Sequence, residues 1–218
     1  GVRRGKRGGK QTYNVRRRKG IMKKIGIIGA MDSEIEHLKK LVAQTAGSTE
    51  THAGGLQFIE GTIHGVPVVI VKSGVGKVNA ALCAQRLIFQ FGATHVINTG
   101  IAGAIAQGLH VLDFVVSTDA VYHDVDATAW GYKPTVIPQM AVSAFPADKT
   151  LQDAIEAAFA DVAHEALFCG HKLIRGRIAS GDQFIAGADA KKRIVAACAP
   201  ACVEMEGAAI AHACYINN

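Results

Sequence analysis

The stretch KIGIIGAMDSE, at residues 24–34, decides the fold. Residues 24–30 form a short apolar run rich in glycine, which is typical of a strand buried on both faces. Asp32 and Ser33 then offer an N-cap for a helix. Apolar side chains follow at helical spacing, at Ile35, Leu38, Leu41 and Val42. A buried strand that leads at once into an amphipathic helix indicates an α/β protein.

The rest of the chain alternates strands and helices in the same way. Further strands are expected at residues 57–63, 66–72, 95–99, 114–117, 173–180 and 201–205, the first two forming a hairpin around Gly65. Helices are expected at residues 78–91, 151–162 and 207–215, the last apolar nearly all round and therefore deeply buried. No internal repeat or second linker appears. The prediction is a single-domain, three-layer αβα sandwich around a central mixed sheet.

Composition and charge exclude several classes of protein. Of 218 residues, 49% are hydrophobic and 19% charged, which excludes disorder for most of the chain. No apolar run reaches the roughly 20 residues of a membrane helix, so no membrane association is expected. The net charge is +6, but nine of the 24 basic residues lie within residues 1–22, and no acidic residue precedes Asp32. Residues 1–22 are therefore interpreted as a disordered, non-native basic tail, the alternative being an arm that binds nucleic-acid phosphates. No nucleic-acid partner is expected.

The five cysteines do not indicate a metal site or a disulfide framework. Their number is odd, and no CxxC pair occurs. They are interpreted as small buried thiols in a reducing cytoplasm. The string YHDVD, at residues 122–126, has three possible metal ligands, but without a partner cluster it is interpreted as a hydrogen-bonded loop.

Candidate functional residues follow the predicted strands, because ligands bind at the carboxyl ends of strands in open α/β sheets. Glu34 lies in the first turn of a helix, where it can act as a base or only complement the helix dipole. Glu206 enters a predicted buried helix and must be paired or functional. Phe184 can stack on a flat base or belong to the core. The glycine turns at residues 73–77 and 98–104 can approach a ligand or serve only as turns.

Six strings occur in one order along the chain: GIIGAM-x-x-E, KSG-x-GK, NTG-x-AG, YHD-x-D-x-TA-x-GY, SGD-x-FI and VEMEG-x-AIAH. Together they resemble the 5′-methylthioadenosine/S-adenosylhomocysteine nucleosidases of the purine nucleoside phosphorylase superfamily, from about Lys24 to the last residues. The resemblance implies a nucleoside phosphorylase-like fold and hydrolysis of the N-glycosidic bond, releasing adenine and a 5-thio-substituted ribose. It also implies no metal or cofactor, a small-molecule nucleoside substrate, a cytoplasmic homodimer and a role in methionine salvage.

The resemblance also implies roles for individual residues. Glu34 matches the carboxylate that activates the attacking water. Glu206 matches the carboxylate that binds the ribose hydroxyls, with Met205 packing on the sugar. Together they would stabilise an oxocarbenium-like transition state.

Other matching residues would form the rest of the pocket. Phe184 would stack on adenine, and the backbone of Ile185 would contact its edge. Met31 and Gly103 would line the pocket. The alkylthio group would be held by Val75 together with Trp130 and Pro138 of the partner subunit. This shared pocket is the reason to expect a homodimer.

The sequence departs from the family pattern in two places. Relatives carry a late Arg-x-x-Ser-Asp stretch whose Asp protonates the purine, whereas this sequence ends at Asn218, and Asp182 does not match that acid. We therefore expect residues 23–218 to be a nucleosidase domain without its last strand and helix, inactive or nearly so and poorly stable. Ile101 also stands where many relatives carry serine.

Two other functions remain open. The first is another enzyme of the superfamily, either a nucleoside phosphorylase or a hydrolase of a related nucleoside. A phosphorylase would need cations around phosphate, and the arginines of the predicted domain (Arg86, Arg175, Arg177 and Arg193) lie in no recognised phosphate motif, which favours water as the nucleophile. A non-catalytic protein that binds adenine nucleosides is the second alternative.

Overall fold

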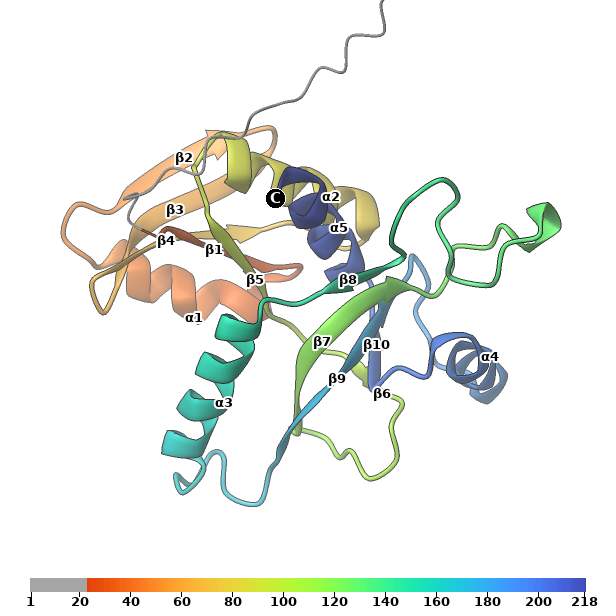
Figure 1. Cartoon of the computed structure of the whole chain (residues 1–218). Coiled ribbons are helices and arrows are strands. Elements are labelled where there is room, and N and C mark those ends of the chain that lie inside the picture. Colours follow the sequence, from red (N-terminus) through yellow and green to blue (C-terminus); the bar gives the residue numbers. More distant parts are fainter. Residues whose placement is uncertain (1–22) are drawn as a thin grey trace, which may run out of the picture.

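The computed structural model describes residues 23–218, so the predicted basic tail at residues 1–22 lies outside the described residues. The α/β class with mixed sheets is confirmed, and its strands pair into two five-stranded sheets with helices packed around them (Figure 1). Within the described residues, no helix has both the length and the apolar character needed to cross a membrane.

The first sheet is built around the strand that opens the described chain. In spatial order its strands are β2 (Thr49–Ala53), β3 (Leu56–Ile63), β4 (Val66–Lys72), β1 (Ile25–Gly29) and β5 (His95–Asn98). β1 pairs in parallel with both β4 and β5, whereas β2, β3 and β4 pair antiparallel. The predicted hairpin at Gly65 is confirmed as β3 and β4.

The second sheet is also mixed. Its strands in spatial order are β6 (Gly103–Ala104), β10 (Cys202–Glu204), β9 (Leu173–Ser180), β7 (Phe114–Tyr122) and β8 (Ala144–Pro146). β9 pairs in parallel with β7 and β10. β7 continues five residues beyond the predicted end at Ser117, past a register shift between Ser117 and Ala120. The acidic Asp119 is accommodated there because Arg177 donates to both of its carboxylate oxygens, at 2.8 and 2.7 Å.

Helices cover both faces of the first sheet. The helices of the described residues are α1 (Asp32–Ala43), α2 (Lys77–Phe89), α3 (Lys149–Val162), α4 (Ala188–Cys198) and α5 (Gly207–Asn217), with a short 3₁₀ helix η1 (Thr128–Trp130); α3 and α4 pack on the second sheet. α1 buries Ile35 and Val42 against Ile27, Ile59 and Ile70. α2 and α5 lie together on the opposite face, as Figure 1 shows, over a core that includes side chains of both sheets.

The burial of α5 differs from the prediction. Only Ala208, Ala209 and Ile210 of this helix are buried, whereas Tyr215 and Ile216 are 42% and 62% exposed. The first turn packs between the two sheets. The later turns contact α2, and His212 and Tyr215 pack on Phe145 of β8. An all-round apolar helix is therefore only partly buried in the described structure.

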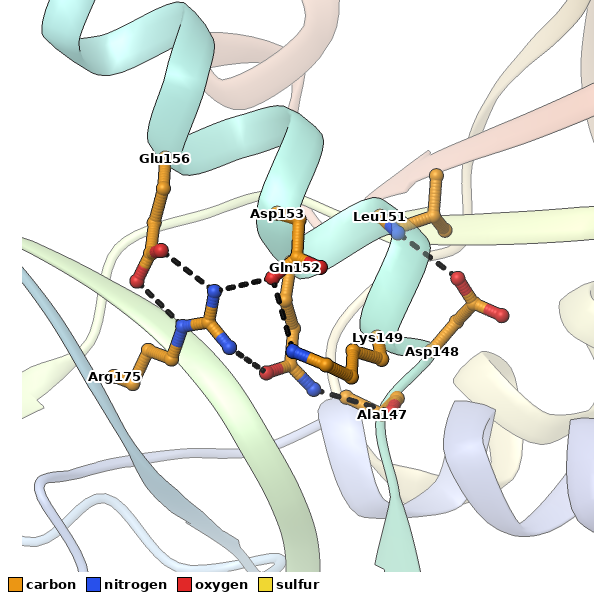
Figure 2. Close-up of polar contacts among 8 residues, drawn as sticks. All are labelled: Ala147, Asp148, Lys149, Leu151, Gln152, Asp153, Glu156 and Arg175. Carbon is orange, nitrogen blue, oxygen red and sulfur yellow. Dashed lines mark hydrogen bonds and ion pairs between the residues drawn. The ribbon is translucent and has the colours of Figure 1, made fainter.

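An ionic network joins α3 to β9 (Figure 2). The Arg175 guanidinium donates to Asp153 and to Glu156, in each case at 2.6 Å, and to the side-chain oxygen of Gln152 at 3.1 Å. These bonds hold the pKa values of Glu156 and Asp153 below their usual range. Asp148 caps the start of the same helix. The network fixes the position of α3 against the second sheet.

Candidate active site

Three loops meet at the carboxyl edge of the first sheet. Gly29 and Lys72 are register partners at the ends of β1 and β4, and the N–H of Ser73 donates to the carbonyl of Gly29 at 2.9 Å. The N–H of Thr99, just after β5, donates to the carbonyl of Ile28 at 2.9 Å. The glycine turns at residues 73–77 and 98–104 therefore lie beside the segment that carries Glu34.

Glu34 is held by main-chain donors. Its Oε2 accepts hydrogen bonds from the N–H groups of Ala30 and Met31, at 2.8 and 3.0 Å. Its Oε1 accepts from the N–H of Ile101 at 3.0 Å. A Cβ on Gly100 would lie 2.5 Å from this Oε1, so a side chain there would displace the carboxylate. The Ile101 bond comes from a second loop, outside the helix that Glu34 begins, so the position of this carboxylate is fixed from two segments.

Glu206 lies at the N-cap of α5 and is only 8% exposed. Its Oε1 accepts a hydrogen bond from the N–H of Gly76 at 2.7 Å. Burial raises the pKa of Glu206, and the negative charges of Glu204 and Glu34 raise it further. Charge interactions weaken with distance, so Glu34 and Glu206 belong to one electrostatic site.

Glu204 is a site residue to which sequence reasoning gave no role. It accepts hydrogen bonds from the Ser180 hydroxyl and from the N–H groups of Glu206 and Gly207, the latter two at 2.9 and 2.7 Å. Burial raises its pKa, and the charge of Glu34 adds to this effect. Glu204 thereby anchors the start of α5 and the backbone of Glu206. Its only signal in the sequence is its place beside Glu206 in VEMEG.

Phe184 lies in the loop at residues 181–187, between β9 and α4. Its side chain is 88% exposed, so the alternative that it belongs to the core is wrong. The neighbouring Ile185 packs instead against a buried cluster that includes Val121 and Ala179. One residue thus anchors the loop, while the aromatic ring next to it is free to contact a ligand.

The loop that contains YHDVD is hydrogen-bonded, as predicted. Asp124 accepts from the Lys77 ammonium and from the N–H of Asp182, and Asp126 accepts from Thr128. Within residues 23–218, no group of three or more His, Cys, Asp or Glu side chains is arranged to hold a metal ion.

The remaining predicted residues fall into two groups. Met31 and Val75 lie in the loops that hold Glu34 and Glu206, Met205 lies between Glu204 and Glu206, and Gly103 lies in β6 beside β10. Trp130, which is 78% exposed, and Pro138 lie in the long segment between β7 and β8. Figure 1 shows this segment projecting away from the two sheets. The roles of these residues stay predictions.

Buried carboxylates and an exposed aromatic ring at the carboxyl ends of strands define an α/β protein with a small-molecule site at the edge of its sheets. The family can be stated directly. The chain belongs to the phosphorylase superfamily, whose family model matches residues 24–218.

Individual relatives confirm the resemblance drawn from the sequence. The 5′-methylthioadenosine/S-adenosylhomocysteine nucleosidase of Shewanella frigidimarina is 42% identical over 203 residues, covering 89% of this chain and 81% of the relative. The nucleosidase of the same name from Colwellia psychrerythraea, solved with adenine, superposes with a TM-score of 0.79 at 39% identity, covering 90% and 78% of the two chains. The futalosine hydrolase of Helicobacter pylori superposes with a TM-score of 0.78 at 32% identity, covering 90% and 80%.

Proposed function

We propose that this protein hydrolyses the N-glycosidic bond of 5′-methylthioadenosine and S-adenosylhomocysteine, releasing adenine and a 5-thio-substituted ribose. The observation that carries the proposal is the pair of carboxylates at one sheet edge, Glu34 with three main-chain donors and Glu206 with one. The nucleosidase relatives support the choice of substrate.

The two carboxylates serve different steps. Glu34 takes a proton from water, whose oxygen then attacks the anomeric carbon of the sugar while the bond to the purine breaks. Glu206 accepts hydrogen bonds from the ribose hydroxyls, and both negative charges stabilise the oxocarbenium-like transition state. The departing adenine takes up one proton from solvent, and Glu34 then releases to solvent the proton that it took from water, so one water molecule is consumed in total. Water is the nucleophile, so the proposal includes no cofactor.

The substrate would occupy the space between the loops described above. The Phe184 ring would stack on adenine, whose edge would meet the backbone of Ile185. Met205 would pack on the sugar. Further lining residues would be Met31, Gly103 and Val75, with Trp130 and Pro138 of the partner subunit.

We also propose that the protein is a homodimer that associates through α2 and α5. Val78, Leu82 and Ile216 are 69%, 60% and 62% exposed on this face. Two shallow, mainly apolar cavities of about 290 and 340 Å³ adjoin them, and Tyr122 and His212 line both. A continuous exposed apolar surface of this kind favours a protein partner. The sequence resemblance further supports a cytoplasmic location and a role in methionine salvage.

The direct test is adenine release from 5′-methylthioadenosine by the purified chain. Glu34→Gln is expected to lower turnover at least about 100-fold, because a general base contributes 10²–10⁴-fold. Glu36→Gln is the matched control, since Glu36 lies on the same helix, is exposed and pairs with Lys40. Equal turnover by Glu34→Gln and the wild type would contradict the proposal. The absolute rate also tests the expectation that the chain is inactive or nearly so, which ordinary turnover would refute.

Three alternatives are distinguished by the same assay together with adenine binding. The structural likeness to futalosine hydrolase favours a related nucleoside as the second candidate substrate, so kcat/KM is compared for 5′-methylthioadenosine, S-adenosylhomocysteine and futalosine. Stimulation by phosphate, with a sugar phosphate as product, would indicate a phosphorylase. Adenine binding without any turnover would indicate a non-catalytic binder.

A further inference from the structure

Lys77 lies where three segments distant in the sequence meet. Its N–H donates to Oδ1 of Asp182 at 2.8 Å, and its Nζ lies 2.5 Å from Oδ2 of Asp124 and 3.7 Å from Oδ2 of Asp182. The N–H of Asp182 in turn donates to Oδ2 of Asp124 at 2.9 Å. Lys77, Asp124 and Asp182 therefore form a closed set of contacts, here named the Lys77 clamp.

The clamp depends on the lysine charge. The side chains of Lys77 and Asp124 are only 24% and 14% exposed, so solvent screens this pair weakly. Burial acts to raise the pKa of Asp124, but the hydrogen bonds from Lys77 and from the Asp182 N–H hold that pKa below its usual value. Oδ1 of Asp124 is buried without a hydrogen-bond partner among the described residues. The Lys77 ammonium lies near both Asp124 and Asp182, so without it these two carboxylates would repel each other.

The clamp is directly connected to the candidate active site. Gly76, the residue before Lys77, donates to Glu206, and Phe184 follows Asp182 by two residues. A Cβ on Gly181 would lie 2.5 Å from Nε2 of His123, so the loop at residues 181–187 packs directly on the segment that carries Asp124. The turn at Gly76 and Lys77 thus contacts both the Glu206 carboxylate and the loop that carries Phe184.

We propose that Lys77 is a positioning residue for nucleoside binding, which fastens the Phe184 loop in place relative to Glu206. The proposal rests on the proposed function, because it takes Phe184 as the residue that contacts the base. Lys77 need not touch the substrate, since its ammonium is engaged by Asp124 and faces the Tyr122 ring at 5.4 Å from the centroid.

The test compares Lys77→Met and Lys77→Arg with the wild-type chain. The adenine Kd is measured by calorimetry, and kcat and KM are measured with 5′-methylthioadenosine. Lys77→Met is expected to raise the Kd and the KM roughly 10-fold, the usual effect of losing a hydrogen bond to a charged group, with kcat little changed. Lys77→Arg keeps the charge and is expected to restore part of the affinity.

Lys24→Met is the matched control. Lys24 pairs with Glu60 at 2.8 Å, and the two side chains are 31% and 29% exposed, so this pair resembles the clamp but lies at the opposite end of β1. Its loss is expected to leave the adenine Kd unchanged. A purely structural role of Lys77 would lower the melting temperature without changing the Kd or separating KM from kcat.

Each outcome decides the proposal. An adenine Kd within about two-fold of the wild-type value in folded Lys77→Met would overturn it. If Lys77→Met does not fold by circular dichroism, Asp182→Asn takes its place under the same criterion, because the Asp182 side chain is half exposed. A wild-type chain that binds adenine without turnover contradicts the proposed function, and the Kd comparison still decides the role of Lys77. Absence of adenine binding by the wild type would overturn both.

Discussion

The main-chain N–H of Gly76 donates a 2.7 Å hydrogen bond to Oε1 of Glu206, which lies 130 residues further along the chain. The φ angle of Gly76 is +101°, a conformation that favours glycine. A single glycine turn therefore sets the position of a buried carboxylate in the candidate site.

Replacing Gly76 by alanine is expected to weaken adenine binding as well as stability. The new Cβ would be strained by the positive φ and would lie 3.2 Å from Oδ1 of Asp182. Gly55→Ala is the control, since φ is +78° and no atom lies within 4 Å of its Cβ. Both variants are expected to lose about 1–3 kcal/mol of stability in urea unfolding, but only Gly76→Ala raises the adenine Kd. If Gly55→Ala and Gly76→Ala changed the adenine Kd equally, the turn at Gly76 would have no specific role in positioning Glu206.

Gly100→Ala is expected to reduce turnover through Glu34. Its Cβ would approach Oε1 and Cδ of Glu34 to 2.5 and 2.9 Å, so the carboxylate must move. A displacement of this size in a reacting group costs about 100-fold in rate. We expect kcat to fall by that order while the adenine Kd changes little. Gly187→Ala, where no atom lies within 4 Å, is expected to keep wild-type kcat.

Glu206→Gln is expected to increase stability while weakening substrate binding. Because burial raises the pKa of Glu206, the unfolded chain loses this proton first as the pH rises, and stability falls above the ordinary value of 4.5. Glutamine removes that dependence. The melting temperature of the variant relative to the wild type should therefore rise from pH 4 to pH 7. If the melting temperature of the variant relative to the wild type fell from pH 4 to pH 7, the pKa of Glu206 would not be raised in the folded chain.

The Arg175 network is expected to stabilise the fold only above acidic pH. Asp153 and Glu156 have pKa values lowered from 3.8 and 4.5 by hydrogen bonds from Arg175, so their contribution is present above those values. It is lost as the pH falls through the lower folded values. Arg175→Met should therefore lower the melting temperature more at pH 7 than at pH 3. Lys192→Met removes an exposed pair at 3.6 Å and should have no effect at either pH.

Leu82→Glu is expected to dissociate the proposed homodimer. The side chain is 60% exposed and lines one of the cavities between α2 and α5. Light scattering after gel filtration should give twice the chain mass of 22.9 kDa for the wild type and the single mass for the variant. Leu167→Glu alters another exposed leucine, outside α2 and α5, and should remain dimeric. A monomeric wild type would contradict the proposed assembly.

The sequence predicts most of the elements that bury an apolar face. β1 and α1 follow from an apolar run and a helical stripe, and both pack as expected. β2 was not predicted because its residues TETHA are polar and remain partly or fully exposed at the sheet edge. α4 was not predicted because only Ile194 and Cys198 of this helix are buried. Short edge elements receive their structure from neighbouring strands rather than from their own pattern.

The candidate site is predictable only in part, for a related reason. Glu34 and Glu206 can be selected because each follows a strand and begins a helix. Two of their hydrogen-bond donors, Ile101 and Gly76, are 67 and 130 residues away, and main-chain amides carry no signal in the sequence. Sheet register brings these groups together, and the Lys77 contacts arise in the same way.

The main-chain donors around Glu34 limit how this site can vary. Except through proline, no exchange of side chains can remove the amides of Ala30, Met31 and Ile101. Evolution or engineering could retune this carboxylate only by reshaping the peptide loops, for example at Gly29 or Gly100, where any larger residue would collide with its neighbours. The path of the backbone thus sets the position of the Glu34 carboxylate, and an inspection of polar side chains alone would not reveal its hydrogen-bond donors.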